Sequence, residues 1–503
     1  MATQPHRMLS DREDEPTSVD DWLRGVGEFG PYQRRHFAIV TSAWFFLSWG
    51  TLSMVFVNTH PGWRMPNSTI VSTKPPPCGD KSHPFELVDP HTTIQGDFRL
   101  VCDREWLSGL TDSLYFVGFG IGASLLGWLS DRYGRRLACA IASLVFGVAA
   151  LASAAAPTLP VFAALRLVEG IGVGGAGTCV YVLAAECIGP SWQGAQGLMQ
   201  MAIFAVGGVC LVVPHGLLRG WRALTVATAV PPFAFAFIFL RLVPESPRWL
   251  LANGRTEAAS RLLFEIARVN RADVDAPPTL APPRASAEAS SGLADLVLTP
   301  GIRRRTLAMA FLWAAGCFAY YGLALSADNL GGSLEFNFAL MSAIELPGLA
   351  VGAGAIDRFG RRATLSVCYA GGGLAAAACV FLPEGNPTVF FAILGKCLIS
   401  AAFGVCFVYA AELFPTTLRA AGMGVASTAA RVGAGVAPTV VLLGAIAPWL
   451  PLLIFGVVSL AAAVVTLALP ETLGRPLPET VADCEETASM GSAHRPLSPA
   501  HVQ

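Results

Sequence analysis

The sequence predicts an all-α membrane protein with twelve membrane-spanning helices in two repeated six-helix halves. Of its 503 residues, 53% are hydrophobic and only 14% are charged, whereas soluble domains carry about 25% charged residues. Apolar runs of about 20 residues recur along the chain, which is the length that crosses a hydrocarbon core of about 30 Å. The third observation is an internal repeat at an offset of 226 positions (357 − 131 = 226).

The repeat rests on three charged motifs that recur with one spacing. Asp-Arg-Tyr-Gly-Arg-Arg at 131–136 returns as Asp-Arg-Phe-Gly-Arg-Arg at 357–362. An Ala-Glu pair and a Pro-Glu-Ser/Thr triplet return at the same offset. The repeated unit is much longer than a solenoid repeat, which indicates two pseudo-symmetric halves. Their matching acids are Glu186 with Glu412 and Glu245 with Glu471.

The apolar runs and the polar segments between them define the predicted organisation. The expected spans are 36–58, 106–128, 137–156, 159–184, 196–215, 222–243, 306–327, 334–356, 363–382, 387–411, 421–445 and 448–469. We assign 1–35 to a cytoplasmic N-terminus, 36–243 to the first half, 244–305 to a cytoplasmic linker, 306–469 to the second half and 470–503 to a cytoplasmic tail. Within the linker, 254–271 favours a basic helix, and 272–292 is rich in Pro, Ala and Ser, which is typical of a flexible segment. The tail after about 481 is polar, which predicts disorder.

Positive charge indicates the orientation. Arginines precede the first span, follow the second, eighth and tenth, and cluster between the sixth and seventh. The opposite short connections at 157–160, 383–387 and 446–448 contain no cation. Because cytoplasmic loops carry the excess of Lys and Arg, both termini are predicted to be cytoplasmic. Residues 1–35 lack the apolar core of a signal peptide, so the first span is expected to serve as the insertion signal.

The long outer loop at 59–105 carries two modification signals. Asn67 begins an Asn-Ser-Thr glycosylation acceptor on the expected outer side, which predicts a glycoprotein. Cys78 and Cys102 are the loop's two cysteines, and an oxidising exterior favours a disulfide between them. Two free thiols remain the alternative.

Several functional classes are excluded by composition and by context. The net charge of −1 does not indicate a nucleic-acid partner. The twelve cysteines show neither CxxC nor Cys/His metal spacing. The Gly-Val-Gly-Gly-Ala-Gly run at 172–177 resembles a dinucleotide fingerprint, but it lies inside an apolar helix, where small residues let two helices approach closely. No Walker A sequence occurs, so we expect no ATP-driven pumping by this chain alone. We expect neither an enzyme nor a cofactor.

The repeated motif at 131–136 and 357–362 is predicted to form part of an inner gate. Its glycine permits a tight turn, and its cations hold the loop at the aqueous side. Its acid either caps a neighbouring helix dipole or pairs with a nearby cation, and such contacts must open when an inner gate opens. The expected gating and structural residues are Asp131, Arg132, Arg135, Arg136, Glu186, Glu245, Arg248, Asp357, Arg358, Arg361, Arg362, Glu412 and Arg419.

Four further charges lie at membrane depth, where each is costly unless it is paired or faces a cavity. Arg166 has Glu169 one turn further on, which favours a structural role. Glu345 and Lys396 lie at similar depths in their helices, which favours a structural salt bridge between them. Arg431 has no acid in its own span, and its repeat mate is Ala205. A ligand-binding role and an unseen structural partner both remain open for Arg431.

Aromatic residues cluster in the same predicted helices. Tyr320 and Tyr321 lie deep in their span, and Phe403 and Phe407 share one helical face. Tyr181 is the repeat mate of Phe407. Core packing explains any one of them, but together with Arg431 they indicate an aromatic cage suited to organic ions.

These features resemble the organic cation, anion and zwitterion transporters of the major facilitator superfamily. The resemblance covers about 22–270 and 295–485 and includes Val-Gly-Glu-Phe-Gly-Pro-Tyr-Gln at 26–33, Leu-Val-Cys-Asp at 100–103 and Pro-Glu-Ser-Pro-Arg-Trp-Leu at 244–250. Tyr-Tyr-Gly-Leu at 320–323 and Glu-Leu-Phe-Pro-Thr at 412–416 also match. The resemblance implies alternating access by two six-helix halves around a central site in a multi-pass protein of the plasma membrane.

By position, the resemblance places seven residues at the substrate: Tyr181, Phe204, Tyr320, Tyr321, Phe403, Phe407 and Arg431. Arg431 falls where anion and carnitine-type members have Arg and cation members have Asp. Leu349 stands where anion transporters often have a second cation, so zwitterions fit better than dianions. We therefore expect a transporter of small, carnitine-like or carboxylate-bearing organic ions. An organic cation transporter and a non-transporting receptor on the same fold remain alternatives, and a coupling ion is left open.

Overall fold

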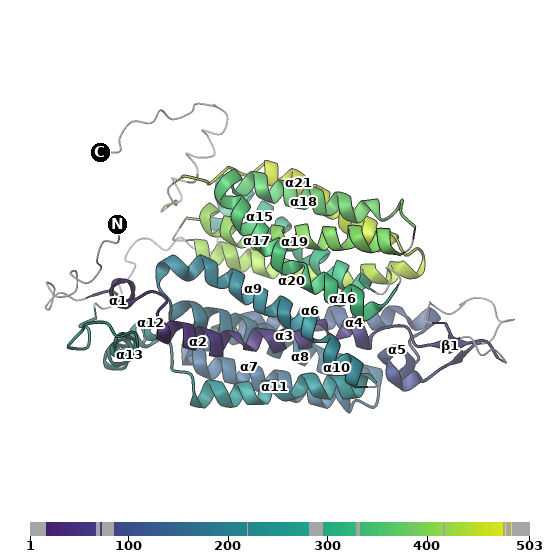
Figure 1. Cartoon of the computed structure of the whole chain (residues 1–503), viewed down its shortest axis with the longest axis horizontal. Helices are drawn as coiled ribbons and strands as arrows, with labels where there is room; N and C mark the ends of the chain where they lie inside the picture. Colours follow the sequence, from purple (N-terminus) through teal and green to yellow (C-terminus); the bar gives the residue numbers. More distant parts are fainter. Residues whose placement is uncertain are drawn as a thin grey trace. The chain divides into compact units, whose positions relative to one another are not determined.

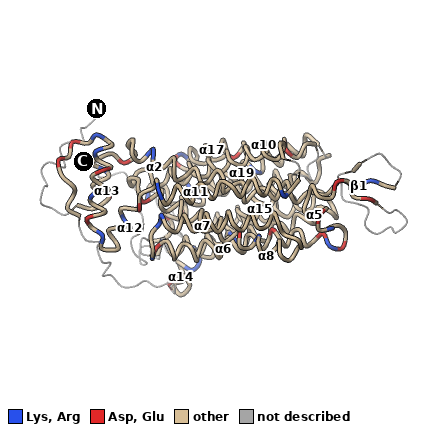
Figure 2. Tube along the Cα trace, turned by 90° about the horizontal axis from the view of Figure 1, so that it is seen from below, with Lys and Arg blue, Asp and Glu red and all other residues tan. Residues whose placement is uncertain are grey.

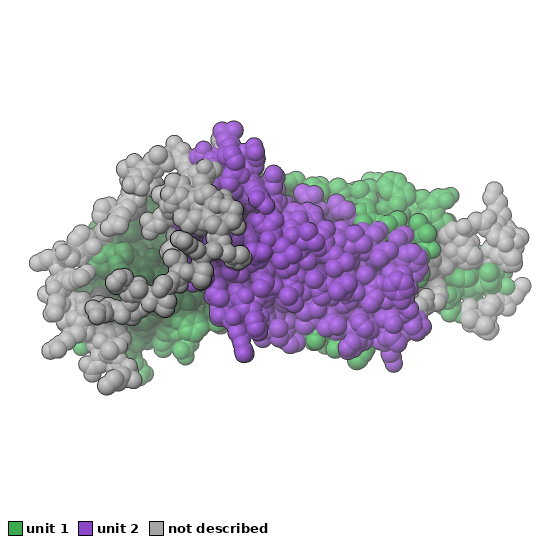
Figure 3. All heavy atoms as spheres, turned by 90° about the horizontal axis from the view of Figure 1, so that it is seen from above, with its two compact units in different colours: residues 1–287, 324–346, 438–448 green, residues 288–323, 347–437, 449–503 purple. Residues whose placement is uncertain are grey.

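The computed structural model describes residues 17–66, 71–72, 85–218, 220–280, 295–327, 332–383, 385–415, 418–475, 478 and 484. The chain divides into two compact units, which Figure 3 colours separately. Unit 1 comprises 1–287, 324–346 and 438–448, and unit 2 comprises 288–323, 347–437 and 449–503.

The elements of residues 17–280 are almost entirely helical. They are α1 (Val19–Val26), α2 (Pro31–Thr41), α3 (Ala43–Leu52), α4 (Met54–Val57), β1 (Trp63–Arg64), β2 (Glu86–Leu87), η2 (Pro90–Thr92), α5 (Ile94–Asp97), η3 (Cys102–Arg104), α6 (Trp106–Tyr133), α7 (Arg135–Ala154), α8 (Leu159–Glu186), η4 (Pro190–Trp192), α9 (Gln193–Cys210), α10 (Val212–Leu217), α11 (Trp221–Arg241), α12 (Pro247–Ala252) and α13 (Thr256–Val269). Strands β1 and β2 pair antiparallel, with Trp63 opposite Leu87.

The elements after residue 294 are helical throughout the described part. They are α14 (Asp295–Leu298), α15 (Pro300–Leu325), α16 (Leu334–Ala343), α17 (Glu345–Phe359), α18 (Arg361–Ala378), α19 (Asn386–Leu413), α20 (Arg419–Val441), η6 (Leu442–Ala445) and α21 (Leu450–Leu467). In unit 2, α18 packs against both α19 and α21.

The described residues contain eleven helical segments that are long and apolar enough to cross a membrane. The twelfth predicted span is α18, which is apolar after its two leading arginines. The structure therefore has the twelve-helix organisation that the sequence predicts, with helix ends shifted by a few residues. The first span begins at Pro31, earlier than expected, and continues to Val57 with short interruptions at Ser42 and Ser53. Near these breaks, hydroxyls of Thr41 and Ser42 hydrogen-bond carbonyls one turn back, which competes with the helical ladder.

The helices of unit 1 approach closely where glycines face a neighbour. Helices α6 and α8 lie side by side, as do α7 and α11 (Figure 1). A Cβ atom on Gly118 or Gly122 of α6 would collide with the backbone of α8, and one on Gly170 or Gly174 of α8 would collide with the backbone of α6. The small-residue run that resembles a nucleotide motif is therefore a helix-packing surface.

One end of unit 1 carries a small helical cluster outside the spans. Helices α1, α12 and α13 share a core that includes Trp22, Trp249 and Leu263, and Trp22 Nε1 donates to Leu263 O at 3.1 Å. Charged residues gather around α12 and α13 and again near α5 and β1, whereas the middles of the helices are mostly uncharged (Figure 2). The predicted basic helix at 254–271 is present as α13, while most of the predicted tail lies outside the described residues.

Candidate functional site

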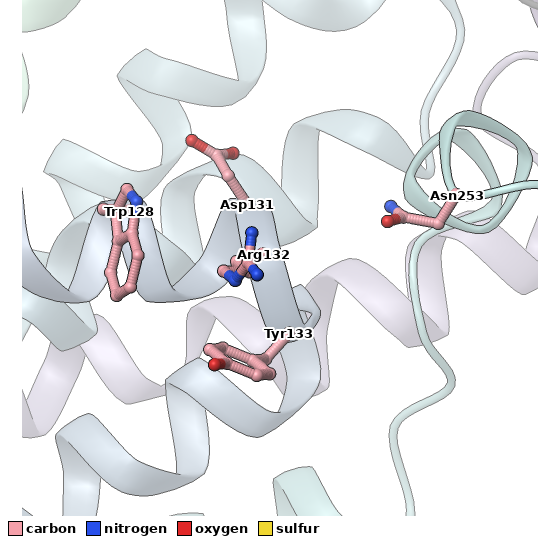
Figure 4. A pocket seen from close by; sticks show the side chains of 5 residues that line it. All are labelled: Trp128, Asp131, Arg132, Tyr133 and Asn253. Atoms are coloured by element: carbon pink, nitrogen blue, oxygen red, sulfur yellow. The ribbon is translucent and has the colours of Figure 1, made fainter.

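The inner-face motif of unit 1 forms a charged network. Arg135 donates from Nε to Glu186 Oε2 at 3.2 Å and from Nη2 to Oε1 at 3.0 Å. Its Nη1 also pairs with Asp131. Residues at the end of α6 line a surface cavity of about 570 Å³ beside this network (Figure 4), and they are Trp128, Asp131, Arg132 and Tyr133, joined by Asn253.

Glu245 closes the network from the segment between α11 and α12. Its carboxylate accepts the backbone N–H groups of Arg135 at 2.9 Å and Arg136 at 3.2 Å, which begin α7. The preceding residue, Gly134, has a φ of 113° and no side chain that could cap the helix. The first turn of α7 is therefore capped by a carboxylate from about 110 residues further along the chain.

Unit 2 repeats this arrangement. Arg361 donates from Nε and Nη2 to Glu412 Oε1 at 3.1 and 2.9 Å, and its Nη1 lies 3.8 Å from Asp357. Glu471 accepts the backbone N–H groups of Arg361 at 2.8 Å and Arg362 at 3.1 Å, at the start of α18. The four positions of each network differ from their mates by the same 226 residues, so the repeat extends to the hydrogen bonds.

The two networks show which role the motif acids Asp131 and Asp357 have: pairing with a nearby cation or capping a neighbouring helix. Asp131 and Asp357 pair with the arginine four residues on and remain 73% and 78% exposed. The helix caps are supplied by Glu245 and Glu471 instead. Two consequences follow: the motif acids are accessible, and the capping acids connect the ends of helices that are distant in sequence.

The remaining predicted inner-face residues lie at the same helix ends. Arg248 lies in the first turn of α12, donates to Glu186 O at 3.2 Å and pairs with Asp20 of α1 at 2.6 Å. Arg132 and Arg358 each lie over the ring of the next residue, Tyr133 and Phe359, at 6.0 and 5.5 Å. Arg419 begins α20.

Unit 2 contains a connected group of aromatic side chains. The ring of Trp313 on α15 lies 4.3 Å from Phe407 and 5.9 Å from Phe403, both on α19. Tyr320 lies 6.2 Å from Phe403 and 5.0 Å from Tyr321. Four of the predicted cage residues are thus brought together, and Trp313 joins them. Trp313 is not among the residues predicted from the sequence, although it precedes Tyr320 by seven residues and so shares its helical face.

One cation contacts this aromatic group, and a second lies on α20 of the same unit. Lys396 is 1% exposed, its Nζ lies 3.1 Å from the centroid of the Tyr320 ring, and it donates to Tyr320 O at 3.0 Å. Arg431 is half-buried on α20. Arg431 lies two residues before Gly433, where a Cβ atom would collide with the backbone of Ala314, so α20 packs closely against α15 there. Glu345, the predicted partner of Lys396, is buried and belongs to unit 1, whereas Lys396 belongs to unit 2. The salt bridge between them stays a prediction.

The other two predicted cage residues belong to unit 1. Phe204 on α9 is buried with its ring 6.2 Å from that of Trp44 on α3. Tyr181 on α8 is half-buried, and a Cβ on Gly197 of α9 would lie 3.2 Å from its hydroxyl. A single cage formed by both units remains a prediction.

Unit 1 also holds contacts between residues that the repeat assigns to different halves. The rings of Phe56 on α4 and Phe338 on α16 lie 4.9 Å apart at 73°, and Phe56 stacks on His215 at 4.3 Å. His215 Nε2 lies 3.4 Å from Glu335 Oε1. These contacts lie at the end of unit 1 opposite α12 and α13, where the predicted outer loop begins (Figure 1), and we expect an outer gate there.

A buried polar group lies near this end of α6 and α8. Arg166 Nη1 lies 2.8 Å from Glu169 Oε1, and its guanidinium lies 4.4 Å from the ring of Tyr115. The pair is 3% and 1% exposed, as suits the structural role expected for Arg166. The Tyr115 hydroxyl lies 2.9 Å from Thr51 Oγ1. The sequence analysis did not single out Tyr115 or Thr51, because neither is charged.

The outer-loop predictions are described only in part. Asn67 and Cys78 lie outside the described residues. Cys102 is disulfide-bonded, and its pairing with Cys78 stays a prediction. Asp97, near the end of the loop, accepts from Trp221 Nε1 at 3.0 Å and from Arg222 Nη2 at 2.9 Å, which ties the loop to the start of α11. Although burial raises the pKa of Asp97, hydrogen bonds from His91, Trp221 and Arg222 hold it below its ordinary value.

Comparison with known proteins identifies the family. The "Sugar (and other) transporter" family matches residues 42–483. The chain is 30% identical to "Organic cation/carnitine transporter 4" of Arabidopsis thaliana, over 96% of this chain and 94% of the relative. It is 32% identical to "Solute carrier family 22 member 15-like" of Xenopus tropicalis, over 93% of this chain and 97% of the relative.

A solved structure supports the same fold. An inward-open conformation of the xylose transporter XylE from E. coli superimposes with a TM-score of 0.64, covering 91% of this chain and all of that one, at 17% identity. At this identity the likeness concerns the fold alone, and the relatives carry the rest of the assignment. The chain belongs to the sugar (and other) transporter family of the major facilitator superfamily, among the relatives of solute carrier family 22, and is a multi-pass membrane transporter of organic ions rather than an enzyme.

Proposed function

We propose that this protein carries small organic ions bearing a carboxylate, zwitterions foremost, across the plasma membrane by alternating access, with both termini in the cytoplasm. One observation carries the proposal. Among the described residues of unit 2, Lys396 and Arg431 are the charged side chains that lie away from the helix ends, and Lys396 contacts the ring of Tyr320 in the aromatic group.

The positive charge away from the helix ends of unit 2 favours an anionic group on the substrate. The described acids of unit 2, Asp295, Asp357, Glu412 and Glu471, all lie at helix ends. A substrate carboxylate would therefore meet positive potential in this half. The guanidinium of Arg431 can hold a carboxylate through two parallel hydrogen bonds, a geometry that an ammonium does not reproduce.

The aromatic rings suit the other end of a zwitterion. A ring face attracts an ammonium group within about 6 Å of its centroid, and Tyr320 already holds Lys396 in this way. Phe403, Phe407 and Trp313 offer further rings within the same group. Support also comes from the Arabidopsis relative, whose name couples organic cations with carnitine. Carnitine carries a quaternary ammonium and a carboxylate.

Competition uptake into reconstituted vesicles tests this proposal. Labelled carnitine is the substrate, and unlabelled carnitine, glutarate and tetraethylammonium are the competitors. We expect carnitine to compete most strongly, glutarate weakly and tetraethylammonium least. Strongest inhibition by tetraethylammonium, together with its own uptake, would contradict the proposal and assign an organic cation transporter.

A receptor that keeps the fold without transport gives a different outcome. Such a protein would bind labelled carnitine in detergent without accumulating it in vesicles. Uptake is therefore measured beside binding, with empty vesicles and vesicles carrying the Asp103→Asn variant as controls. Asp103 is an exposed acid of η3, so this variant should transport like the wild type.

A further inference from the structure

Polar side chains surround a small cavity at the outer-loop end of unit 1. The cavity has a volume of about 80 Å³. Its polar lining consists of Asn58, His60, Gln95, Glu105, Ser108 and Asp112, together with Thr59. These residues come from the end of α4, from α5 and from the start of α6, which the outer loop connects. None of them belongs to the predicted substrate cage.

The orientation of both amides is determined by their partners. Asn58 Nδ2 donates to Asp112 Oδ2 at 3.1 Å, and Gln95 Nε2 donates to Asn58 O at 3.0 Å. An ionised carboxylate and a backbone carbonyl can only accept hydrogen bonds. The amide nitrogens must therefore point at these acceptors, which leaves Asn58 Oδ1 and Gln95 Oε1 as the free ends.

Three oxygens of this group have no hydrogen-bond donor among the described residues. They are Asn58 Oδ1, Gln95 Oε1 and Asp112 Oδ1, and each is buried. Gln95 is 3% exposed and Asp112 is 5% exposed. A buried acceptor without a donor is costly and rare in folded proteins. Three such oxygens around one cavity indicate a ligand that interacts with oxygen lone pairs.

The neighbouring charges leave the cavity negative. Arg166 on α8 acts electrostatically on Asp112, but its charge is balanced by Glu169, 2.8 Å away. Glu105 also lines the cavity, with Oε1 3.6 Å from His60 Nε2. Burial lowers the pKa of His60, so this imidazole is neutral at pH 7 and offers Glu105 no full positive charge. Asp112 and Glu105 therefore favour a cation.

We propose that this cavity binds a sodium ion, held by the carboxylate of Asp112 and the side-chain oxygens of Asn58 and Gln95. These hard oxygen donors suit a small inorganic cation that carries no soft ligands. Calcium takes six to eight oxygen ligands, often several of them carboxylates, and magnesium demands a near-ideal octahedron. Glu105 lies beside His60 and is not among the proposed ligands, so the set has one carboxylate and two neutral amides, which suits a monovalent ion better. The ion would enter from the outer-loop side, and the proposal does not depend on the substrate class.

Thermal unfolding of the purified full-length protein tests the site without any substrate. The melting temperature is measured while NaCl replaces choline chloride at constant ionic strength. A ligand that binds the folded state raises stability in a saturable way, so the melting temperature should rise with NaCl and level off. Asp112→Asn should raise the half-saturating sodium concentration by at least about tenfold, because it removes the charged ligand.

Two further variants keep the test decisive. Asp103→Asn neutralises an exposed acid of the neighbouring η3 and should leave the sodium response unchanged. Gln95→Met removes the amide oxygen with little change in volume, and it should weaken the response even if Asp112→Asn fails to fold.

A wild-type melting temperature that is equal in NaCl and choline chloride would overturn the proposal and leave the cavity to water. A sodium response that survives in both Asp112→Asn and Gln95→Met would also overturn it. Stabilisation by lower pH in place of sodium would assign a proton to Asp112 and refute the sodium assignment.

Discussion

Replacing Glu245 with Ala should destabilise the first turn of α7. The ion pair of Arg135 with Glu186 should remain. The carboxylate of Glu245 accepts the backbone N–H groups of Arg135 at 2.9 Å, Arg136 at 3.2 Å and Ser246 at 3.0 Å. Because Gly134 offers no side-chain acceptor, the variant leaves the first turn of α7 to water alone.

The expected loss can be worked out from two contributions. Removal of a helix cap costs about 0.5–2 kcal/mol, and removal of a carboxylate from a helix N-terminus costs about 0.3–1 kcal/mol. Glu245 is half-buried, so we expect a combined loss of about 2 kcal/mol, which is roughly a thirtyfold rise in the population of the opened end. Glu245→Gln keeps one acceptor oxygen and should lose about half as much.

Thermal unfolding in detergent and hydrogen exchange of the α7 amides are the assays. Glu257→Ala is the matched control, because Glu257 lies in the first turn of α13 and is 88% exposed in its pair with Arg261. This control should lose at most about 0.5 kcal/mol. Equal losses in Glu245→Ala and Glu257→Ala, or unchanged exchange at the start of α7, would refute the capping argument.

Three other predictions concern the ion pair of Asp131, the helix cap of Glu471 and the ring contact between Phe56 and Phe338. Asp131→Asn should lower the initial rate of uptake at wild-type surface expression, because it removes the ion pair with Arg135, and a wild-type rate would contradict the gate hypothesis. Although burial raises the pKa of Glu471, the backbone N–H groups that it accepts hold it below its ordinary value. The stabilisation by this cap is therefore present above the ordinary pKa of glutamate and is lost as pH falls through the lowered pKa. Melting temperatures measured across this pH window should fall less steeply in Glu471→Gln than in the wild type, and equal slopes would contradict the assignment. The rings of Phe56 and Phe338 lie 4.9 Å apart, so a bifunctional thiol crosslinker that joins Phe56→Cys and Phe338→Cys in one protein should stop uptake. Continued uptake by fully crosslinked protein would argue against an outer gate there.

Much of the fold could be predicted from the sequence because its main signals are local or periodic. Apolar runs locate the spans, since the bilayer requires a fixed helix length. The offset between Asp131 and Asp357 predicts two halves, and the structure repeats the pairing of Arg135 with Glu186 as that of Arg361 with Glu412. An i, i+4 spacing also predicts that Phe403 and Phe407 meet, and their rings lie 5.2 Å apart.

The features that escaped sequence reasoning depend on contacts between distant segments. Nothing local assigns the cap of α7 to Glu245, which lies 110 positions beyond Arg135. Asp112 lies at the polar start of a span, where an acid is ordinary, and its burial follows only from its packing beside Asn58. The ring of Tyr320 lies under Lys396 within unit 2, a contact that residue spacing does not indicate, while the predicted salt bridge of Lys396 with Glu345 stays a prediction.

Concentration-dependent uptake by Arg431→Ala tests the central claim, which is that a cation in the second half binds the carboxylate of the substrate. Carnitine and tetraethylammonium are compared at equal surface expression, with Arg431→Lys as the conservative variant. Loss of a hydrogen-bonded charged contact of about 1.5–3 kcal/mol should raise the KM for carnitine roughly tenfold to hundredfold. Arg431→Lys should recover only part of this loss, because Lys lacks the planar fork. The KM for tetraethylammonium should change little or fall. An equal rise in KM for both substrates would show that Arg431 supports the fold and does not bind the carboxylate.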